Sequence, residues 1–158
     1  MRRSKFRGER GFTLIEIMVV VVILGVLAAI IVPKFLSRPD EAKVTKAKVD
    51  IKGLEEALGL FKLDNGFYPS TEQGLNALVS KPESGRIPSR FPDGGYLKRV
   101  PADPWNNPYL YLSPGQQGRD FDLISYGADG QPGGEDDAAD ISNHTIDEEE
   151  KTAAEANQ

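Results

Sequence analysis

Apolar and polar residues follow three different patterns along the chain. Residues 12–32 are apolar except for Thr13 and Glu16. In residues 44–61, apolar side chains recur every three or four positions among charged ones, and from residue 67 onward the chain is rich in Gly, Pro and Asp. The first pattern predicts a membrane-spanning helix, the second an amphipathic helix, and the third a body of short strands and loops.

The charge around the apolar run predicts its orientation. A helix over 12–32 would be about 30 Å long, which matches the hydrocarbon core of a bilayer. Residues 1–11 carry five basic and one acidic side chain, a net +4; because the whole chain is −5, the rest carries −9. This distribution places the N-terminus in the cytoplasm and the body outside. A basic head on an acidic body also argues against nucleic-acid binding.

The apolar run could also be one of two simpler segments, a cleaved signal peptide or a plain membrane anchor. A cleaved secretory signal peptide would need a shorter apolar core and a small-residue cleavage site, and 26–28 (Val-Leu-Ala) is a poor one. A plain membrane anchor explains the length but leaves Glu16 without a reason, since a carboxylate at mid-bilayer costs about 2.5–3.5 kcal/mol.

The residues around Glu16 suggest a partner for it. Gly11 ends the basic head, and Phe12 lies four residues before Glu16, on the same face of a helix. Cleavage after Gly11 would give Phe12 a free amine that could pair with the Glu16 carboxylate, in the same chain or in a neighbour. Alternatively, Glu16 only favours the positive end of the helix dipole, which requires a helix that starts near Phe12.

The segment RGERGFTLIEIMVVVVILGVLAAIIVP (7–33) resembles the N-terminal signature of type IV pilins and type II secretion pseudopilins. The resemblance implies that a prepilin peptidase cuts between Gly11 and Phe12 and methylates the new N-terminus at Phe12. It also implies that Glu16 is the glutamate that directs assembly.

The amphipathic segment predicts a helix packed on the body. Its apolar stripe consists of Val44, Ala47, Ile51, Leu54, Leu58 and Phe61. Pro33 and Pro39 interrupt the chain before it, by kinking or melting the helix, and Asn65-Gly66 is a stop signal. A free coiled-coil dimer is the alternative, which the short stripe and the globular segment directly after it disfavour.

The body itself predicts an α+β fold, a long helix on a small antiparallel sheet. Ser70 and Gln73 have capping-box spacing at the start of a short helix, whose apolar side is Leu75, Leu78 and Val79. Strands are expected at 109–112 and 121–126, with a third possible at 141–146. We therefore divide the chain into a cleaved leader (1–11), a transmembrane and assembly helix (12–36), a periplasmic globular domain (37–146) and an acidic disordered tail (147–158).

Several further segments narrow the resemblance. YPSTEQGLNAL (68–78), GGYLKR (94–99), DPWNNPY (103–109), LSPGQQGR (112–119) and YGADG (126–130) are similar to the major pseudopilin family of type II secretion. That family implies a type IV pilin-like fold and a periplasmic filament of many copies, the pseudopilus, which drives folded proteins through the outer membrane. Its implied partners are minor pseudopilins and an inner-membrane platform with a cytoplasmic ATPase. For residues 103–105 we expect a turn whose Trp105 covers the core.

The loop at 126–140, YGADGQPGGEDDAAD, places many carboxylates in a short stretch. Calcium prefers such oxygen ligands, but the spacing is not that of an EF-hand, and a solvated acidic loop is the alternative. The family resemblance implies one calcium ion, held by the side chains of Asp129, Asp136 and Asp137 and by the carbonyl of Tyr126. The added residues up to Asp140 leave the roles of Asp137 and Asp140 open.

Composition argues against catalysis. The chain has no cysteine and one histidine, His144, and it shows neither a Gly-x-Ser-x-Gly elbow nor a phosphate-binding glycine loop. We predict a structural subunit that is not an enzyme. A type IV pilus subunit for adhesion, DNA uptake or motility is the main alternative, and a membrane-tethered calcium-binding hydrolase is another.

Overall fold

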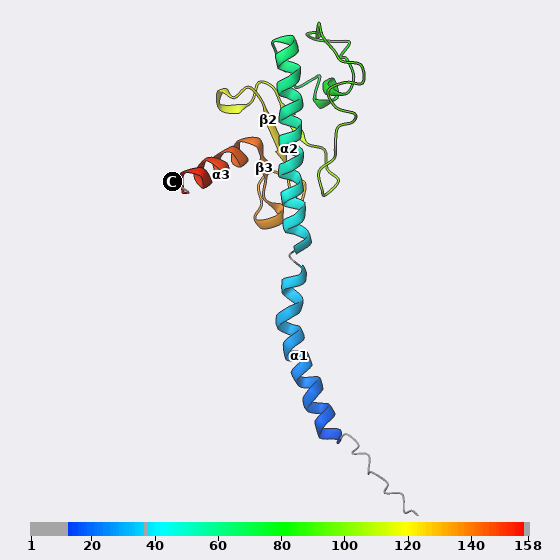
Figure 1. Ribbon diagram of the computed structural model, residues 1–158, viewed down its shortest axis with the longest axis vertical. Coiled ribbons are helices and arrows are strands. Elements are labelled where there is room, and N and C mark those ends of the chain that lie inside the picture. Colours follow the sequence, from blue (N-terminus) through cyan, green and yellow to red (C-terminus); the bar gives the residue numbers. More distant parts are fainter. Residues whose placement is uncertain (1–12, 37, 157–158) are drawn as a thin grey trace, which may run out of the picture. The chain divides into compact units, whose positions relative to one another are not determined.

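The computed structural model describes residues 13–36 and 38–156, and for 28–36, 38–39 and 137 it describes the backbone only. The described chain forms two compact units, one up to Pro39 and one from Asp40. Its elements, in order, are α1 (Leu14–Leu36), α2 (Arg38–Asn65), η1 (Leu75–Leu78), β1 (Leu110–Leu112), η2 (Gln116–Gly118), β2 (Asp122–Ser125), η3 (Asp136–Ala138), β3 (Ile141–Ser142) and α3 (Asn143–Glu155) (Figure 1).

The first unit contains α1, which ends at Leu36, together with the first two residues of α2. Pro33 lies inside α1, so the helix continues through it for another turn. Pro39 is the second residue of α2, in the first turn, where a missing backbone N–H breaks no intrahelical bond. Among the helices of the described residues, none combines the length and the hydropathy that a membrane span requires.

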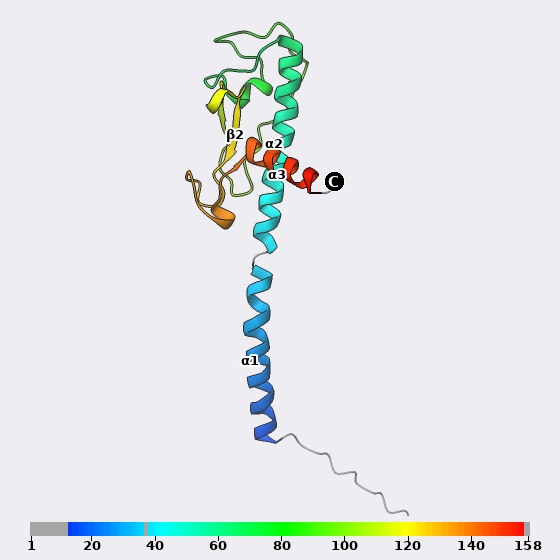
Figure 2. The same ribbon diagram turned by 90° about the vertical axis from the view of Figure 1, so that its left-hand side faces the viewer.

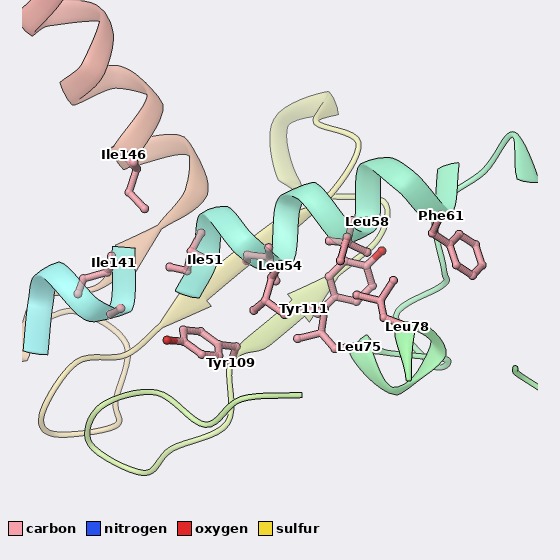
Figure 3. Close-up of a cluster of buried hydrophobic side chains, with 13 residues drawn as sticks. Ile51, Leu54, Leu58, Phe61, Leu75, Leu78, Tyr109, Tyr111, Ile141 and Ile146 are labelled. Atoms are coloured by element: carbon pink, nitrogen blue, oxygen red, sulfur yellow. The ribbon is translucent and has the colours of Figure 1, made fainter. Parts of the chain in front are cut away.

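The core of the second unit forms where α2 packs on the sheet. The predicted stripe of α2 is confirmed, since Ala47, Ile51, Leu54, Leu58 and Phe61 are all buried and Val44 packs beside them. Figure 3 shows Ile51, Leu54 and Leu58 of α2 beside Tyr109 and Tyr111, and Leu75 and Leu78 of η1 belong to the same cluster. The helix ends at Asn65, and Gly66 follows with a φ of 79° that a residue with a side chain rarely adopts.

The sheet has three antiparallel strands in the order β1-β2-β3. In its register, Tyr111 lies opposite Leu123 and Ser125 lies opposite Ile141. The strands predicted at 109–112 and 121–126 are confirmed, one residue shorter at the ends. The third strand, which was expected to reach 146, stops at Ser142 because the chain turns there into α3.

The capping box predicted at Ser70 and Gln73 forms, but it does not start a helix. Ser70 N donates to Gln73 Oε1 (3.0 Å), and Gln73 N donates to Ser70 Oγ (3.3 Å). These bonds close a turn, and the following helix is the short 3₁₀ segment η1, which begins only at Leu75. The interruption falls at Gly74, whose φ is 60° and whose ψ is −170°, outside any helical conformation.

The disordered tail predicted from residue 147 is wrong as far as Glu155, because these residues continue α3. Ser142 caps this helix by accepting the N–H of Thr145, and Thr145 Oγ1 accepts the N–H of Ser142. Ile146 is buried, and lysines of α2 pair with the acidic side chains that follow it. Figures 1 and 2 show α3 beside α2 within the second unit.

Candidate assembly and metal sites

Glu16 takes part in the cap of α1. Glu16 N donates to Thr13 Oγ1 (3.3 Å), and Thr13 N donates to Glu16 Oε2 (3.4 Å). This reciprocal pair is a capping box, which satisfies two of the backbone donors that a helix N-terminus leaves free. The Glu16 carboxylate is exposed and lies at the positive end of the helix dipole. Gly11 and Phe12, the residues of the predicted cleavage site, lie outside the described residues.

Beyond Glu16, the side chains of α1 are apolar around its whole circumference as far as Leu27. Its described large apolar side chains are all between 45% and 80% exposed: Leu14, Ile15, Ile17, Met18, Val19, Val20, Val21, Val22, Ile23, Leu24, Val26 and Leu27. Consecutive residues of a helix point in all directions, so no polar face remains to meet water. Such a surface requires lipid or other apolar helices around it.

Asp103 anchors the turn that precedes the sheet. It is buried, and its Oδ1 accepts the N–H groups of Trp105 (3.1 Å) and Asn107 (2.7 Å). Ser125 Oγ of β2 donates to its Oδ2 at 2.7 Å. The predicted turn is confirmed, and Trp105 packs against the core. The link to Ser125 was missed by sequence analysis, because no local pattern connects positions 22 residues apart.

The acidic loop at 126–140 is tied to the body at its start. Gly127 is buried, and its carbonyl accepts Asn107 Nδ2 at 3.4 Å. Within the loop, Asp129 Oδ1 accepts Gln131 N (3.0 Å) and Asp140 Oδ2 accepts Gly133 N (2.9 Å). Two of the loop carboxylates therefore order the loop backbone.

The predicted calcium ligands have the right chemistry, and the structure describes the surroundings of three of them. Asp129 and Asp136 are exposed, Tyr126 is half-buried, and the side chain of Asp137 lies outside the described residues. Within the described part of the chain, no three acidic, His or Cys side chains lie close enough together to hold a metal. The loop offers only oxygen donors, including its carbonyls, which is the set that calcium uses.

Two tyrosines join the core to α2 and to the segment after it. Tyr109 OH donates to Asp50 Oδ2 (3.1 Å), and burial together with the nearby Asp50 carboxylate raises the pKa of Tyr109. Tyr111 OH donates to the carbonyl of Pro69 (2.8 Å), and burial raises the pKa of Tyr111 to about 12. Both groups stay neutral and rigid at physiological pH, so they position elements and carry no proton chemistry.

Asp122 at the start of β2 is the buried charge of the hairpin. Burial opposes its ionisation, but hydrogen bonds from Arg119 Nε and from Gln116 N, both 2.7 Å, outweigh that cost and lower the pKa of Asp122. Asp122, with its bonds to Arg119 and Gln116, holds the turn between β1 and β2 in one conformation.

Comparison with known proteins decides the family. A model described as type II secretion system (T2SS), protein G matches residues 34–144, and a model of the prokaryotic N-terminal methylation motif matches residues 6–32. The chain belongs to the protein G family of the type II secretion system. Within the second match lie Gly11, Phe12 and Glu16, and cleavage between the first two stays a prediction.

Relatives of this family match over most of their length. The type II secretion system core protein G of Pseudomonas aeruginosa is 61% identical over 137 residues, 87% of this chain and 96% of the relative. That of Vibrio cholerae is 53% identical over 143 residues, 90% of this chain and 97% of the relative. The crystal structure of the major pseudopilin from the type 2 secretion system of enterohaemorrhagic Escherichia coli matches with a TM-score of 0.62 and 44% identity, covering 70% of this chain and 90% of that one. The predicted α+β, pilin-like fold is confirmed.

Proposed function

We propose that this chain is a structural subunit that polymerises into the pseudopilus of a type II secretion system. One observation carries the proposal: a protein G body follows an N-terminal methylation motif whose helix is apolar all round. Packing of such helices against one another buries the surface that is otherwise exposed on α1. Many copies joined in this way form a filament that moves folded proteins across the outer membrane.

Before assembly, the subunit resides in the inner membrane. The basic head at 1–11 stays in the cytoplasm, the apolar run crosses the bilayer, and the body from Asp40 lies in the periplasm. A prepilin peptidase removes the head after Gly11 and methylates Phe12. Minor pseudopilins, the inner-membrane platform and its ATPase are the partners that this route requires.

Glu16 sets the register of the filament in this proposal. Its bond from Thr13 N is long, 3.4 Å, and joins a carboxylate to a neutral donor. A charged amine on Phe12 of a neighbouring subunit would form a shorter and stronger bond to the same carboxylate. Because any other register leaves a carboxylate unpaired among apolar helices, one axial offset is favoured.

The variant Glu16→Ala tests this role. We expect the subunit to be inserted and processed as usual but to form no filaments, measured by electron microscopy of sheared material and by secretion of a folded exoprotein. Thr13→Ala is the matched control, because it removes the other half of the same capping box and keeps the carboxylate. Normal filaments from Glu16→Ala would refute the assignment.

We also propose that the loop at 126–140 binds one calcium ion through Asp129, Asp136, Asp137 and the Tyr126 carbonyl. The support is an oxygen-only donor set on a loop whose start is tied to Asn107. The ion would neutralise the loop carboxylates and hold the loop against the body. This role is structural, and we propose no catalytic one, in keeping with a chain that has no cysteine and a single histidine.

A type IV pilus subunit is the less favoured function. The body matches the family model of type II secretion protein G over residues 34–144, and the relatives reported above carry that name.

A further inference from the structure

A groove of about 510 Å³ lies between α2 and α3. Val49, Lys52, Gly53 and Glu56 line it from α2, and Glu149 and Glu150 line it from α3. The α3 wall lies beyond residue 144, where the family match ends. The groove is therefore built in part from a segment that the family comparison does not account for.

The floor of this groove is apolar and open. Val49 is 64% exposed, and a Cβ at Gly53 would meet nothing within 4 Å. An exposed valine beside a glycine on a helix leaves a shallow depression that fits one branched apolar side chain.

The rim of the groove is negative. Lys48 pairs with Glu149, and Lys52 pairs with Asp147 (2.6 Å) and Glu150 (3.4 Å), so both lysines are already neutralised. Glu56 is exposed and forms no ion pair with any described side chain. The rim thus keeps an excess of negative charge. A surface that fits both the apolar floor and this rim would present an apolar side chain flanked by cations.

Residues 84–90 of the same chain present an apolar side chain flanked by cations, and we call this segment the knob. Ile87 is 44% exposed there, between the exposed cations Arg86 and Arg90. Neither arginine forms an ion pair within the described part of the chain, although Arg86 stacks on the ring of Phe67 at 4.0 Å.

The knob is held rigidly although it contains no helix or strand. Gln73 Nε2 donates to the carbonyls of Ser84 (2.7 Å) and Arg86 (3.1 Å). At the other end, Arg90 N donates to Asn65 Oδ1 (2.9 Å), and Pro88 between them is fully buried. A preordered segment loses little conformational entropy on binding, which favours its use as a contact surface.

The groove and the knob cannot meet within one subunit. In Figure 1, α3 lies on one side of α2, and the green loop segment that contains the knob lies on the other. The knob is fastened at Asn65, the last residue of α2, whereas the groove floor is at Val49 and Gly53. The two features are thus offset by about 20 Å along the helix axis.

We infer that the knob of one subunit docks into the α2–α3 groove of a second copy, with Ile87 on Val49 and Gly53 and with Arg90 beside Glu56. Two different surfaces on opposite sides of one body form a heterologous contact, and their offset along the helix axis makes the contact repeat as an open helix, which is what a filament needs. The inference rests on the proposed filament and adds to it a contact between bodies that is independent of α1.

Cysteine cross-linking of the full chain tests the contact directly, because the natural sequence has no cysteine. Chains carrying Ile87→Cys and chains carrying Val49→Cys, with different epitope tags, are produced together in secreting cells and oxidised. A disulfide requires Cα atoms within about 7 Å, so a mixed dimer reports the contact. The matched control pairs Ile87→Cys with Leu63→Cys, which is 81% exposed on α2 and lies outside the groove.

We expect the mixed dimer with Val49→Cys and none with Leu63→Cys. Glu56→Arg on the groove chain and Arg90→Glu on the knob chain should each lower the cross-link yield roughly tenfold. When both chains carry their reversal, the yield should be restored. Lys81→Glu, an exposed charge outside the knob, should leave the yield unchanged.

Three results would overturn the inference while filaments still form: no mixed dimer, equal cross-linking to Leu63→Cys, or a cross-link from Val49→Cys to a different protein. Absence of filaments from the unmodified chain would instead refute the proposed function.

Discussion

Lys52 of α2 and Asp147 of α3, which are 95 positions apart in the sequence, form a salt bridge of 2.6 Å. Lys52 also lies 3.4 Å from Glu150 and 3.7 Å from Glu55, so one cation serves three carboxylates. The hydrogen bond to Asp147 raises the pKa of Lys52. Ile146 is the one buried apolar side chain of α3, and this ionic cluster joins the helix to α2 beside it.

Replacement of Lys52 should loosen α3. We expect Lys52→Met, which keeps the aliphatic stem, to lower the free energy of unfolding by about 1 kcal/mol at low salt, because partly exposed ion pairs contribute little individually and more as a network. The measurement is thermal unfolding of the full chain in detergent at low and high salt. Lys43→Met, which removes the exposed pair with Asp40, is the control and should have a smaller effect. Equal losses for both variants would contradict a docking role for Lys52.

Acid should destabilise the body partly through Asp122. Its pKa in the folded chain is lowered from the usual 3.8, so its contribution to stability is present above that value and is lost as the pH falls through the lower folded pKa. We expect Asp122→Asn to lose about 1–3 kcal/mol at pH 7 and to show a shallower decline below pH 4. Asp120→Asn, which removes an exposed carboxylate paired with Lys62, is the control. An unchanged acid decline in Asp122→Asn would exclude this group as a cause.

The two sides of α2 should respond differently to truncation. Leu54→Ala leaves a cavity in the core between α2 and the sheet, and we expect a loss of about 2–5 kcal/mol. Leu63→Ala removes a side chain of the same size from an exposed position and should change stability by less than about 0.5 kcal/mol. Urea unfolding monitored by the fluorescence of Trp105 measures both. Similar losses for both leucines would contradict the packing of α2 described above.

Calcium should stabilise the body if the loop at 126–140 binds it. An ion present at 100 times its dissociation constant adds about 2.7 kcal/mol to the stability of the folded chain. We therefore expect the melting temperature to rise with calcium and to fall with a chelator, and we expect Asp136→Ala to abolish the difference. Glu155→Ala, an exposed acidic change on α3, should keep it. Melting temperatures that do not depend on calcium would exclude the site.

Features that depend on neighbours in the sequence were predictable from the sequence alone. The stripe from Ala47 to Phe61 follows the period of a helix, so it identified the buried face of α2 without any knowledge of the sheet. The stop at Asn65-Gly66 and the strands around Tyr111 and Leu123 depend on local backbone preferences in the same way. The N-terminal signature is likewise contiguous, and it led to the family that the comparisons establish.

Tertiary structure decided the features whose partners are far apart in the chain. The acidic residues after Asp147 resembled a solvated tail, because the lysines that order them as a helix lie on α2. Tertiary structure also decided the bond from Ser125 to Asp103 and the groove between α2 and α3, because their residues are distant in the sequence. Local preference cannot reveal such pairs, since their free energy arises only once packing of the core has brought distant segments together.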